Sequence, residues 1–267
     1  MDYKIFIINL DRSEDRWQHV QEQLALWPDL PVERVSGTDG YAASAAQINR
    51  YYSEEKNSRT YHKRLKPGEK GGFISHIRCW QKILDEDLDF ALVLEDDFVV
   101  LEDLPQLLAT IVALNQPWHL LKLAMPHKQQ AVLRRQACGA FNLVHYKKNP
   151  ISAVAQAVSR EGARLLLDHE VPFGRPVDIS MQYTWQLGFK ALGLHPQAFR
   201  PAFTFESNIS GKNNKQINRS LFFRLRGQFV WNNFRYNLRT YGWRATLLAR
   251  RSRLKHAAVV PTAGDKT

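Results

Sequence analysis

Short apolar runs alternate along this chain with segments in which apolar residues recur every three or four positions. The runs at 4–9 and 90–94 have apolar side chains on both faces, which is typical of strands buried in a parallel sheet. Between them, apolar residues recur at helical spacing from Trp17 to Trp27, which predicts a helix with Ser13 as its N-cap. Strands and helices in turn predict an α/β sandwich around a mostly parallel sheet.

The same two patterns continue through the chain to residue 194. Further strands are expected at 31–37, 119–124, 152–159 and 189–194. Further helices are expected at 72–84, 103–114, 160–168 and 178–187. A polar, tyrosine-rich loop around 49–68 and a loop at 125–150 complete the expected order.

Composition narrows the class of protein. An apolar fraction of 44% is ordinary for a globular chain. The two cysteines, Cys79 and Cys138, lack metal-ligand spacing, which argues against a disulfide framework or a zinc site and fits a reducing compartment. The apolar run at the N-terminus is too short for a signal peptide, and no run reaches the roughly 18 residues of a membrane span. These features favour a cytoplasmic protein.

The net charge of +11 is unevenly distributed. Residues 207–264 contain no Asp or Glu and twelve Lys or Arg, so the rest of the chain is close to neutral. The sequence therefore predicts a near-neutral domain followed by a basic region, with separate tasks for each.

Three adjacent carboxylates, Glu95, Asp96 and Asp97, directly follow the buried run at 90–94. Side chains alternate along an extended chain, so Glu95 and Asp97 are expected on one side and Asp96 on the other. Two carboxylates on one side suit Mg²⁺ or Mn²⁺ and leave positions for water and substrate phosphates. The alternative is a solvated acidic loop, but the apolar strand that leads straight into it favours metal binding.

Arginines follow the first strand in "NLDRSEDR". Arg12 at the strand end and Arg16 one turn into the helix could bind a diphosphate together with the helix N-terminus. Alternatively, Arg16 pairs with an acid on the helix surface, which the residues alone favour. No glycine-rich phosphate loop is present, so a nucleotide would be held differently.

Five ordered blocks resemble glycosyltransferase family 25, the lipooligosaccharide galactosyltransferases of Gram-negative bacteria and their collagen-modifying relatives. They are "IFIINLDRSEDRW", "RVSGTDG", "GEKGGFISHIRCWQKIL", "ALVLEDDF" and "AVAQAVSREGARLLL…RPVDISM", within residues 3–210. Phe73 stands where the family often has Cys, and we expect it to serve packing. The resemblance implies a GT-A-type fold, a UDP-sugar donor, usually UDP-galactose, and inversion at the anomeric carbon, which gives a β linkage.

By this resemblance, the three carboxylates are the counterpart of the family's D-x-D motif. Asp97, and next Glu95, would hold a divalent cation, Mn²⁺ or Mg²⁺, that bridges the donor phosphates. Asp96 would contact the ribose or a metal-bound water.

Inversion requires a general base to take the proton from the acceptor hydroxyl. Asp178, in "RPVDISM", lies where the family block carries its acid. The alternative is that Asp178 only caps a helix. Glu161 and Asp168 are weaker candidates because both are expected on a helix surface.

Other polar residues at strand ends and helix starts are candidates for donor binding. Ser75 and His76 begin a helix after two glycines, although a lone His on a helix is more often structural. Asp39 could accept from uracil or ribose, although a turn Asp usually bonds its own backbone. The candidate donor-binding residues are Asn9, Arg12, Arg16, Ser36, Gly37, Asp39, Ser75, His76 and Asp96.

The basic region interleaves arginine with Phe, Trp, Tyr and Leu. Residues 212–256 are expected to lie on an anionic inner-membrane surface, with arginine stems around buried rings. Alternatively, these helices pack on the catalytic domain with solvated arginines, or stack on single-stranded nucleic acid.

The expected organisation is a catalytic domain at 1–210, a basic helical appendage at 211–256 and a disordered tail at 257–267. The favoured function is transfer of a hexose from a UDP-sugar to a lipid-linked oligosaccharide of the lipooligosaccharide core, on the inner face of the cytoplasmic membrane and without nucleic acid. The alternative is a basic nucleic-acid- or membrane-binding protein whose nucleotide-binding domain transfers no sugar. Acceptor sugar, linkage position and oligomeric state are left open.

Overall fold

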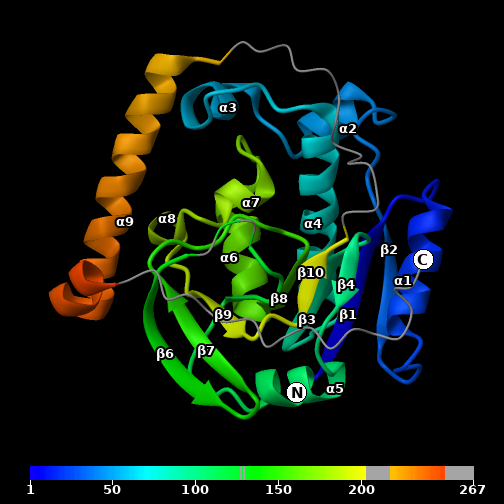
Figure 1. Cartoon of the computed structure of the whole chain (residues 1–267). Helices are drawn as coiled ribbons and strands as arrows, with labels where there is room; N and C mark the ends of the chain where they lie inside the picture. The colour runs from blue at the N-terminus through cyan, green and yellow to red at the C-terminus, as the bar shows by residue number, and fades with distance from the viewer. Residues whose placement is uncertain (127, 129, 203–216, 250–267) are drawn as a thin grey trace, which may run out of the picture.

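An eight-stranded sheet forms the centre of the molecule, with strand order β2-β1-β3-β8-β5-β9-β7-β6 (Figure 1). The computed structural model describes residues 1–126, 128, 130–202 and 217–249, so the predicted tail at 257–267 lies outside the described residues. The strands of this sheet are β1 (Tyr3–Asn9), β2 (Val32–Ser36), β3 (Phe90–Glu95), β5 (Leu120–Lys122), β6 (Val132–Cys138), β7 (Phe141–Tyr146), β8 (Ala155–Ser159) and β9 (Ala191–His195). A second sheet pairs β4 (Phe98–Val100) with β10 (Phe199–Pro201).

Most strands of the large sheet run in one direction, as predicted. The pairs β1–β2, β1–β3 and β5–β9 are parallel. Strand β8 runs against β3 and β5, and β7 runs against β9 and β6. Only β7 and β8 therefore oppose the other strands of this sheet, and the predicted α/β class with a mostly parallel sheet is confirmed.

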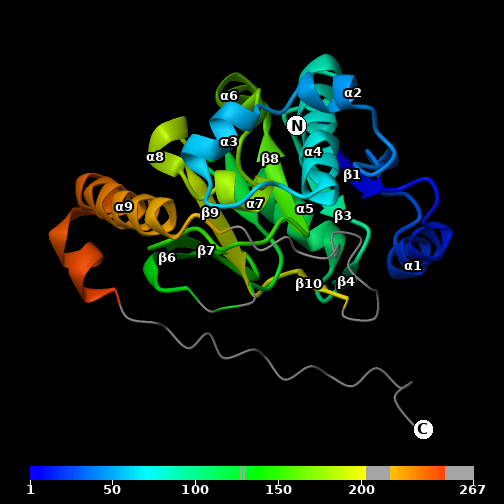
Figure 2. The ribbon, with the colours of Figure 1, turned by 90° about the horizontal axis from the view of Figure 1, so that it is seen from above.

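Helices cover both faces of the sheet and enclose two apolar cores (Figure 2). Helices α1 and α5 contribute Val20, Leu24 and Leu107 to the first core. Helices α4 and α6 contribute Trp80 and Leu166 to the second. The helices are α1 (Glu14–Leu24), α2 (Ala45–Asn49), α3 (Glu54–Thr60), α4 (Pro67–Asp85), α5 (Leu104–Val112), α6 (Arg160–Glu170), α7 (Val177–Ser180), α8 (Thr184–Leu187) and α9 (Arg219–Leu248).

The helix predicted at 178–187 is wrong as a single element. Two short helices, α7 and α8, occupy this stretch, with a turn between them. The Gln182 amide donates to the carbonyl of Asn149 at 2.6 Å, and the Asn149 amide donates to the carbonyl of Met181 at 2.9 Å. These bonds attach the turn to the loop before β8 and compete with continuation of the helix.

Both long loops expected from the sequence contain regular elements. Helix α3 lies within the tyrosine-rich stretch and has Ser53 as its N-cap, which accepts from the backbone N–H of Lys56. Helix α4 begins at Pro67, five residues before its predicted start at 72, because proline at the first helical position needs no N–H partner. The stretch 125–150 contains the β6–β7 hairpin, which turns at Gly139 with a φ of 58°.

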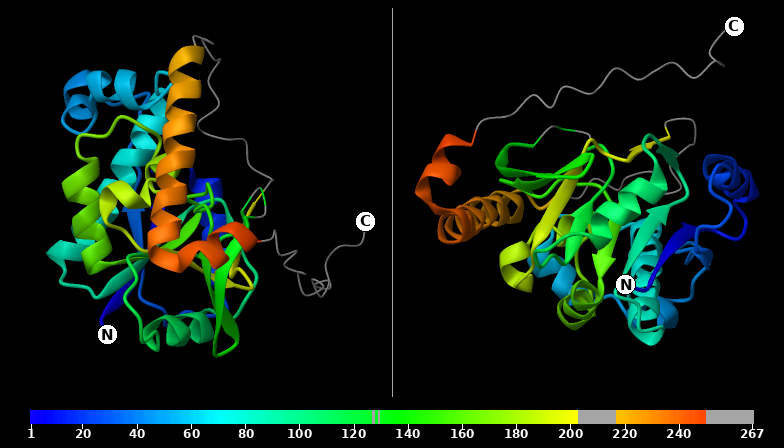
Figure 3. Two further views of the ribbon diagram at one scale, coloured as in Figure 1. Left: turned by 90° about the vertical axis from the view of Figure 1, so that its left-hand side faces the viewer. Right: turned by 90° about the horizontal axis from the view of Figure 1, so that it is seen from below.

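The basic helix α9 packs along the edge of the domain (Figure 3). The side-chain amides of Asn233 and Asn237 both donate to the carbonyl of Lys147, at 2.8 and 2.7 Å. Phe229 contacts the rings of Tyr183 and Trp185 edge-on. One face of this helix therefore packs on the domain that contains the large sheet.

Candidate functional site

The carboxyl ends of three neighbouring parallel strands converge on one pocket. Registers of Ile8 with Glu95 and of Asn9 with Ser36 bring the ends of β1, β2 and β3 level. Ligands bind in this position in open α/β sheets. The predicted residues that line the pocket are Arg12, Arg16, Gly37, Asp39, Ser75, His76, Glu95, Asp96 and Asp97.

Asp96 lines this pocket, and neighbouring side chains hold both oxygens of its carboxylate. One carboxylate oxygen accepts from the side-chain amide of Asn9 at 2.7 Å, and the other accepts from the guanidinium of Arg16 at 2.7 Å. All three residues are buried. Arg16 therefore pairs with a buried acid of the motif, not with an acid on the helix surface. The hydrogen bonds that Asp96 accepts from Asn9 and Arg16 hold the end of β3 against β1 and α1.

Glu95 and Asp97 are left to face the pocket. Burial, and then the negative charge of Glu95, raise the pKa of Asp97 to about 7, although Arg16 at 3.9 Å opposes the shift. One oxygen of Asp97 is buried without a hydrogen-bond partner in the described structure. A divalent cation would neutralise both carboxylates and occupy this oxygen.

The side chains that could bind a metal ion at this site do not enclose it. Within the described ranges, no group of three or more His, Cys, Asp or Glu side chains is arranged to hold a metal ion. Two carboxylates are nevertheless sufficient for Mg²⁺-like ions, because water and substrate phosphates supply the remaining ligands. The residues present therefore fit a cation bound together with a phosphorylated donor.

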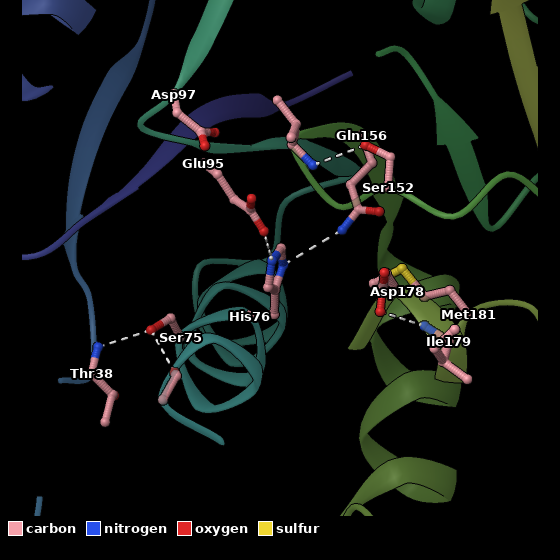
Figure 4. A network of polar contacts seen from close by, with 12 residues as sticks. Thr38, Ser75, His76, Glu95, Asp97, Ser152, Gln156, Asp178, Ile179 and Met181 are labelled. Carbon is pink, nitrogen blue, oxygen red and sulfur yellow. Dashed lines mark hydrogen bonds and ion pairs between the residues drawn. The ribbon is translucent and has the colours of Figure 1, made fainter. Parts of the chain in front are cut away.

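Ser75 and His76 are both buried in the first half of α4, and they have different surroundings (Figure 4). The Ser75 hydroxyl accepts from the backbone N–H of Thr38 at 2.8 Å and donates to the carbonyl of Gly71 at 2.9 Å. It thereby attaches the loop after β2 to the helix. His76 lies between Glu95, at 3.4 Å, and the Gln156 amide, at 3.5 Å.

The loop after β2 lies directly on the start of α4. A Cβ atom at Gly71 would lie 2.3 Å from the carbonyl oxygen of Thr38, so only glycine permits this approach. Asp39 accepts from the backbone N–H of Tyr41 at 3.0 Å and forms an ion pair with Arg12. Arg12 and Asp39 thus both face the pocket while paired with each other.

The remaining predicted donor-binding residues support the pocket from outside its lining. The buried Asn9 accepts from the backbone N–H of Gly37 at 2.8 Å. The Ser36 hydroxyl donates to Asp11 at 2.7 Å, and its carbonyl accepts from Arg78 at 3.1 Å. These contacts hold the ends of β1 and β2 together.

Asp178 lies on α7, outside the residues that line this pocket. Burial, and then the charge of Glu95, raise its pKa, whereas Lys122 and the backbone N–H of Ile179, at 2.8 Å, lower it. Figure 4 shows Asp178 in the same region as Glu95, His76 and Gln156. A carboxyl with a raised pKa next to a strand-end site has the properties of a general base.

The two weaker candidates for the general base lie on a helix surface, as predicted. Glu161 and Asp168 both pair with Arg164 on the surface of α6, with side chains about half exposed at 52% and 54%. Phe73 is fully buried and stacks on Phe173, which confirms its packing role.

Sequence reasoning missed two buried polar residues next to the site. Lys122 on β5 and Gln156 on β8 are 2% and 0% exposed, and both lie in strands that were expected to be apolar throughout. The signal was a polar residue inside each apolar run, Lys122 in "LLKLA" and Gln156 in "AVAQAV". A polar residue at a fully buried strand position needs a specific partner.

Comparison with known proteins identifies the family. Residues 2–181 match the family model described as glycosyltransferase family 25 (LPS biosynthesis protein), and the chain belongs to this family. The matched region contains the whole pocket and Asp178, whereas α9 lies beyond it.

Curated relatives include proteins from animals and bacteria. Procollagen galactosyltransferase 2 of Mus musculus is 29% identical over 188 residues, which cover 66% of this chain and 29% of that protein. Lipooligosaccharide biosynthesis protein lic2B of Haemophilus influenzae is 27% identical over 178 residues, or 61% of this chain and 62% of that protein. The chain thus spans less than a third of the length of the procollagen enzyme.

Among solved structures, a Drosophila galactosyltransferase 7 mutant in complex with manganese, UDP-Gal and xylobiose matches at 10% identity and a TM-score of 0.39. The match covers 81% of this chain and 78% of that one.

Proposed function

We propose that this protein is a metal-dependent, inverting glycosyltransferase of GT-A type that moves a hexose, most simply galactose from UDP-galactose, to a lipid-linked oligosaccharide of the lipooligosaccharide core. The observation that carries the proposal is the pair Glu95 and Asp97 at the pocket, beside Asp96, whose two oxygens accept from Asn9 and Arg16. The bacterial relative named for lipooligosaccharide biosynthesis supports this acceptor class.

Glu95 and Asp97 are the residues that would hold Mn²⁺ or Mg²⁺ with the donor diphosphate. A bound cation supplies Lewis-acid stabilisation of the charge on the departing UDP. Arg12 adds a second positive group at the pocket, and donor phosphate would compete with Asp39 for it. Asp96 serves the site by fixing the backbone between its two neighbours.

Asp178 is proposed to take the proton from the acceptor hydroxyl as that oxygen attacks the anomeric carbon. The attack forms the new glycosidic bond while the bond to UDP breaks, so a single displacement inverts the configuration and gives a β linkage. A raised pKa improves Asp178 as a base, because a stronger base accepts the hydroxyl proton more readily.

The test is binding and turnover of a panel of UDP-sugars, with Mn²⁺, with Mg²⁺ and with chelator. We expect one UDP-sugar to bind in the presence of metal and to release UDP, with a large increase when a lipooligosaccharide core acceptor is added. Failure of every UDP-sugar to bind, with and without metal, would refute the proposal.

We further propose that α9 attaches the protein to the inner face of the cytoplasmic membrane. Its outward face exposes Phe223, Val230 and Trp231 at 67%, 60% and 59%. Exposed arginines flank these side chains at positions 219, 224, 226, 235, 239 and 244. Among the described helices, none is long and apolar enough to cross a membrane.

The chemistry of this face suits an anionic lipid surface. Aromatic and aliphatic side chains would enter the boundary between head groups and acyl chains, and each arginine near the surface contributes about 1 kcal/mol of attraction. Because Phe229 of α9 packs on Tyr183 beside α7, the same helix would present membrane-bound acceptors near Asp178.

We expect the double variant Phe223→Ala/Trp231→Ala to bind vesicles containing phosphatidylglycerol at least about tenfold more weakly than the wild type. The loss of each ring removes on the order of 1.5 kcal/mol or more of favourable free energy from apolar burial. Leu26→Ala is the matched control, since Leu26 is 80% exposed on another part of the surface. Cosedimentation at low and high salt measures both variants. Equal binding of the double variant and the wild type, or equal binding to neutral vesicles, would contradict the membrane proposal.

A further inference from the structure

Lys122 is a buried cation without a carboxylate partner. It is 2% exposed and forms no ion pair with a described Asp or Glu, although the charges of Asp178 and Glu95 act on it from a greater distance. Its ammonium donates to the carbonyl of Ser152, to the side-chain oxygen of Gln156 at 3.4 Å and towards the sulfur of Met181 at 3.8 Å. Burial lowers the pKa of Lys122 to about 8, so the group still carries its proton at neutral pH.

A directed chain of hydrogen bonds leads from Lys122 to the pocket, and Figure 4 shows its steps from Gln156 through His76 to Glu95. Lysine can only donate, so the amide of Gln156 must turn its oxygen towards Lys122 and its NH₂ towards His76. Nδ1 of His76, at 3.5 Å, then accepts, which places the ring proton on Nε2. That proton points at the carboxylate of Glu95, 3.4 Å away.

We propose that Lys122 is a positioning residue for the donor site. By orienting Gln156 it sets the tautomer of His76, and His76 then donates to Glu95 and holds this carboxylate in the orientation that binds the cation. The proposal rests on the proposed function for the role of Glu95, although the hydrogen-bond chain itself does not depend on it.

Residue 122 lies in the buried strand β5, and a lysine is needed there to hold the amide of Gln156 in one orientation. An apolar residue would fit the core but would leave this amide free to rotate by half a turn. With the amide reversed, its oxygen would accept from Nδ1, and the lone pair of Nε2 would face Glu95. Partners behind metal ligands typically change metal affinity or activity by about 10- to 100-fold.

The test combines two variants of this chain with a control. Lys122→Met removes the donor and keeps the length of the side chain, and Gln156→Glu replaces the amide with a group that only accepts. Lys190→Met is the control, since Lys190 is exposed. Thermal melts establish that each variant folds. Nitrogen NMR of the His76 ring reports its tautomer, and calorimetry reports the Kd of Mn²⁺ in the presence of UDP-galactose.

We expect the Nε2–H tautomer of His76 in the wild type, and loss of this tautomer with about 10- to 100-fold weaker Mn²⁺ binding in both test variants. An unchanged tautomer, or a changed tautomer with unchanged Mn²⁺ affinity, would overturn the inference and leave the proposed function intact. A wild type that binds no Mn²⁺ with any UDP-sugar would instead refute the proposed function. If Lys122→Met does not fold, Gln156→Glu decides the same question, because its carboxylate can pair with Lys122.

Discussion

Asp97→Asn is expected to lower sugar transfer by about 10²- to 10⁴-fold, because in the proposed mechanism an amide would bind the cation that stabilises the departing UDP less tightly than a carboxylate. A Lewis-acid contribution of several kcal/mol corresponds to this range at 1.36 kcal/mol per tenfold change. Steady-state rates of UDP release at saturating metal and donor measure the loss. Asp29→Asn, an exposed change of the same chemistry, is the control and should leave the rate unchanged.

The same variant is expected to be more stable than the wild type in the absence of metal. The pKa of Asp97 in the folded protein is raised from its ordinary 3.8 to about 7, so its ionised form is disfavoured by folding. The wild type therefore loses stability as the pH rises from about 4 to 7, and the loss is complete above pH 7. Asparagine does not ionise and avoids this loss.

We expect a gain on the order of 2 kcal/mol at pH 8, which decreases to nothing near pH 4. Melting curves of the metal-free proteins at both pH values measure it. Saturating metal with donor should reverse the order, since only the wild type would gain from binding. Equal stability at pH 8 would show that neither burial nor the charge of Glu95 disfavours the ionised form of Asp97, and the argument for a cation at this carboxylate would fail.

The sequence contains enough information to predict the part of the site that depends on strand order. A buried run that leads straight into Glu95, Asp96 and Asp97 fixes these carboxylates at a strand end, and alternation along the strand separates Asp96 from its neighbours. Because β1, β2 and β3 are adjacent and parallel, the polar groups after each strand meet in one pocket.

Partner choice within the site could not be predicted in the same way. Asp96 was predicted to contact the donor, and the sequence did not show that its two oxygens also accept from Asn9 and Arg16, because this depends on the packing of α1 across the ends of β1 and β3. Lys122 and Gln156 were hidden for a related reason. The neighbouring strand positions are apolar. Only the register of β5 with β8, which pairs Lys122 with Gln156, shows that these two polar residues are partners.

Tertiary contacts explain the error in the helix at 178–187. The pattern at 178–187 is helical in spacing, yet the Gln182 amide donates to the carbonyl of Asn149, the Asn149 amide donates to the carbonyl of Met181, and these bonds interrupt the helix. The hairpin of β6 and β7 escaped prediction because β6 is largely exposed and lacks the alternation of a half-buried strand.

Asp178→Asn is expected to lower kcat by about 10²- to 10⁴-fold with little change in donor affinity, because a general base acts on the acceptor and not on the UDP-sugar. Asparagine keeps an oxygen that can accept from the backbone N–H of Ile179, so the start of α7 should stay folded. Steady-state transfer with a core oligosaccharide and the Kd of UDP-galactose with Mn²⁺ measure the two effects. Asp168→Asn, on the surface of α6, should change neither.

The alternative role of Asp178 makes a different prediction for the same pair of variants. A residue that only caps α7 would give Asp178→Asn nearly wild-type transfer, whereas Asp178→Ala would lower the melting temperature and lower activity only through loss of folded protein. If Asp178 is the base, Asp178→Asn and Asp178→Ala should lower transfer by the folded protein to a similar extent, although the two variants differ in the fraction that is folded. Transfer within tenfold of the wild type in Asp178→Asn would exclude Asp178 as the base.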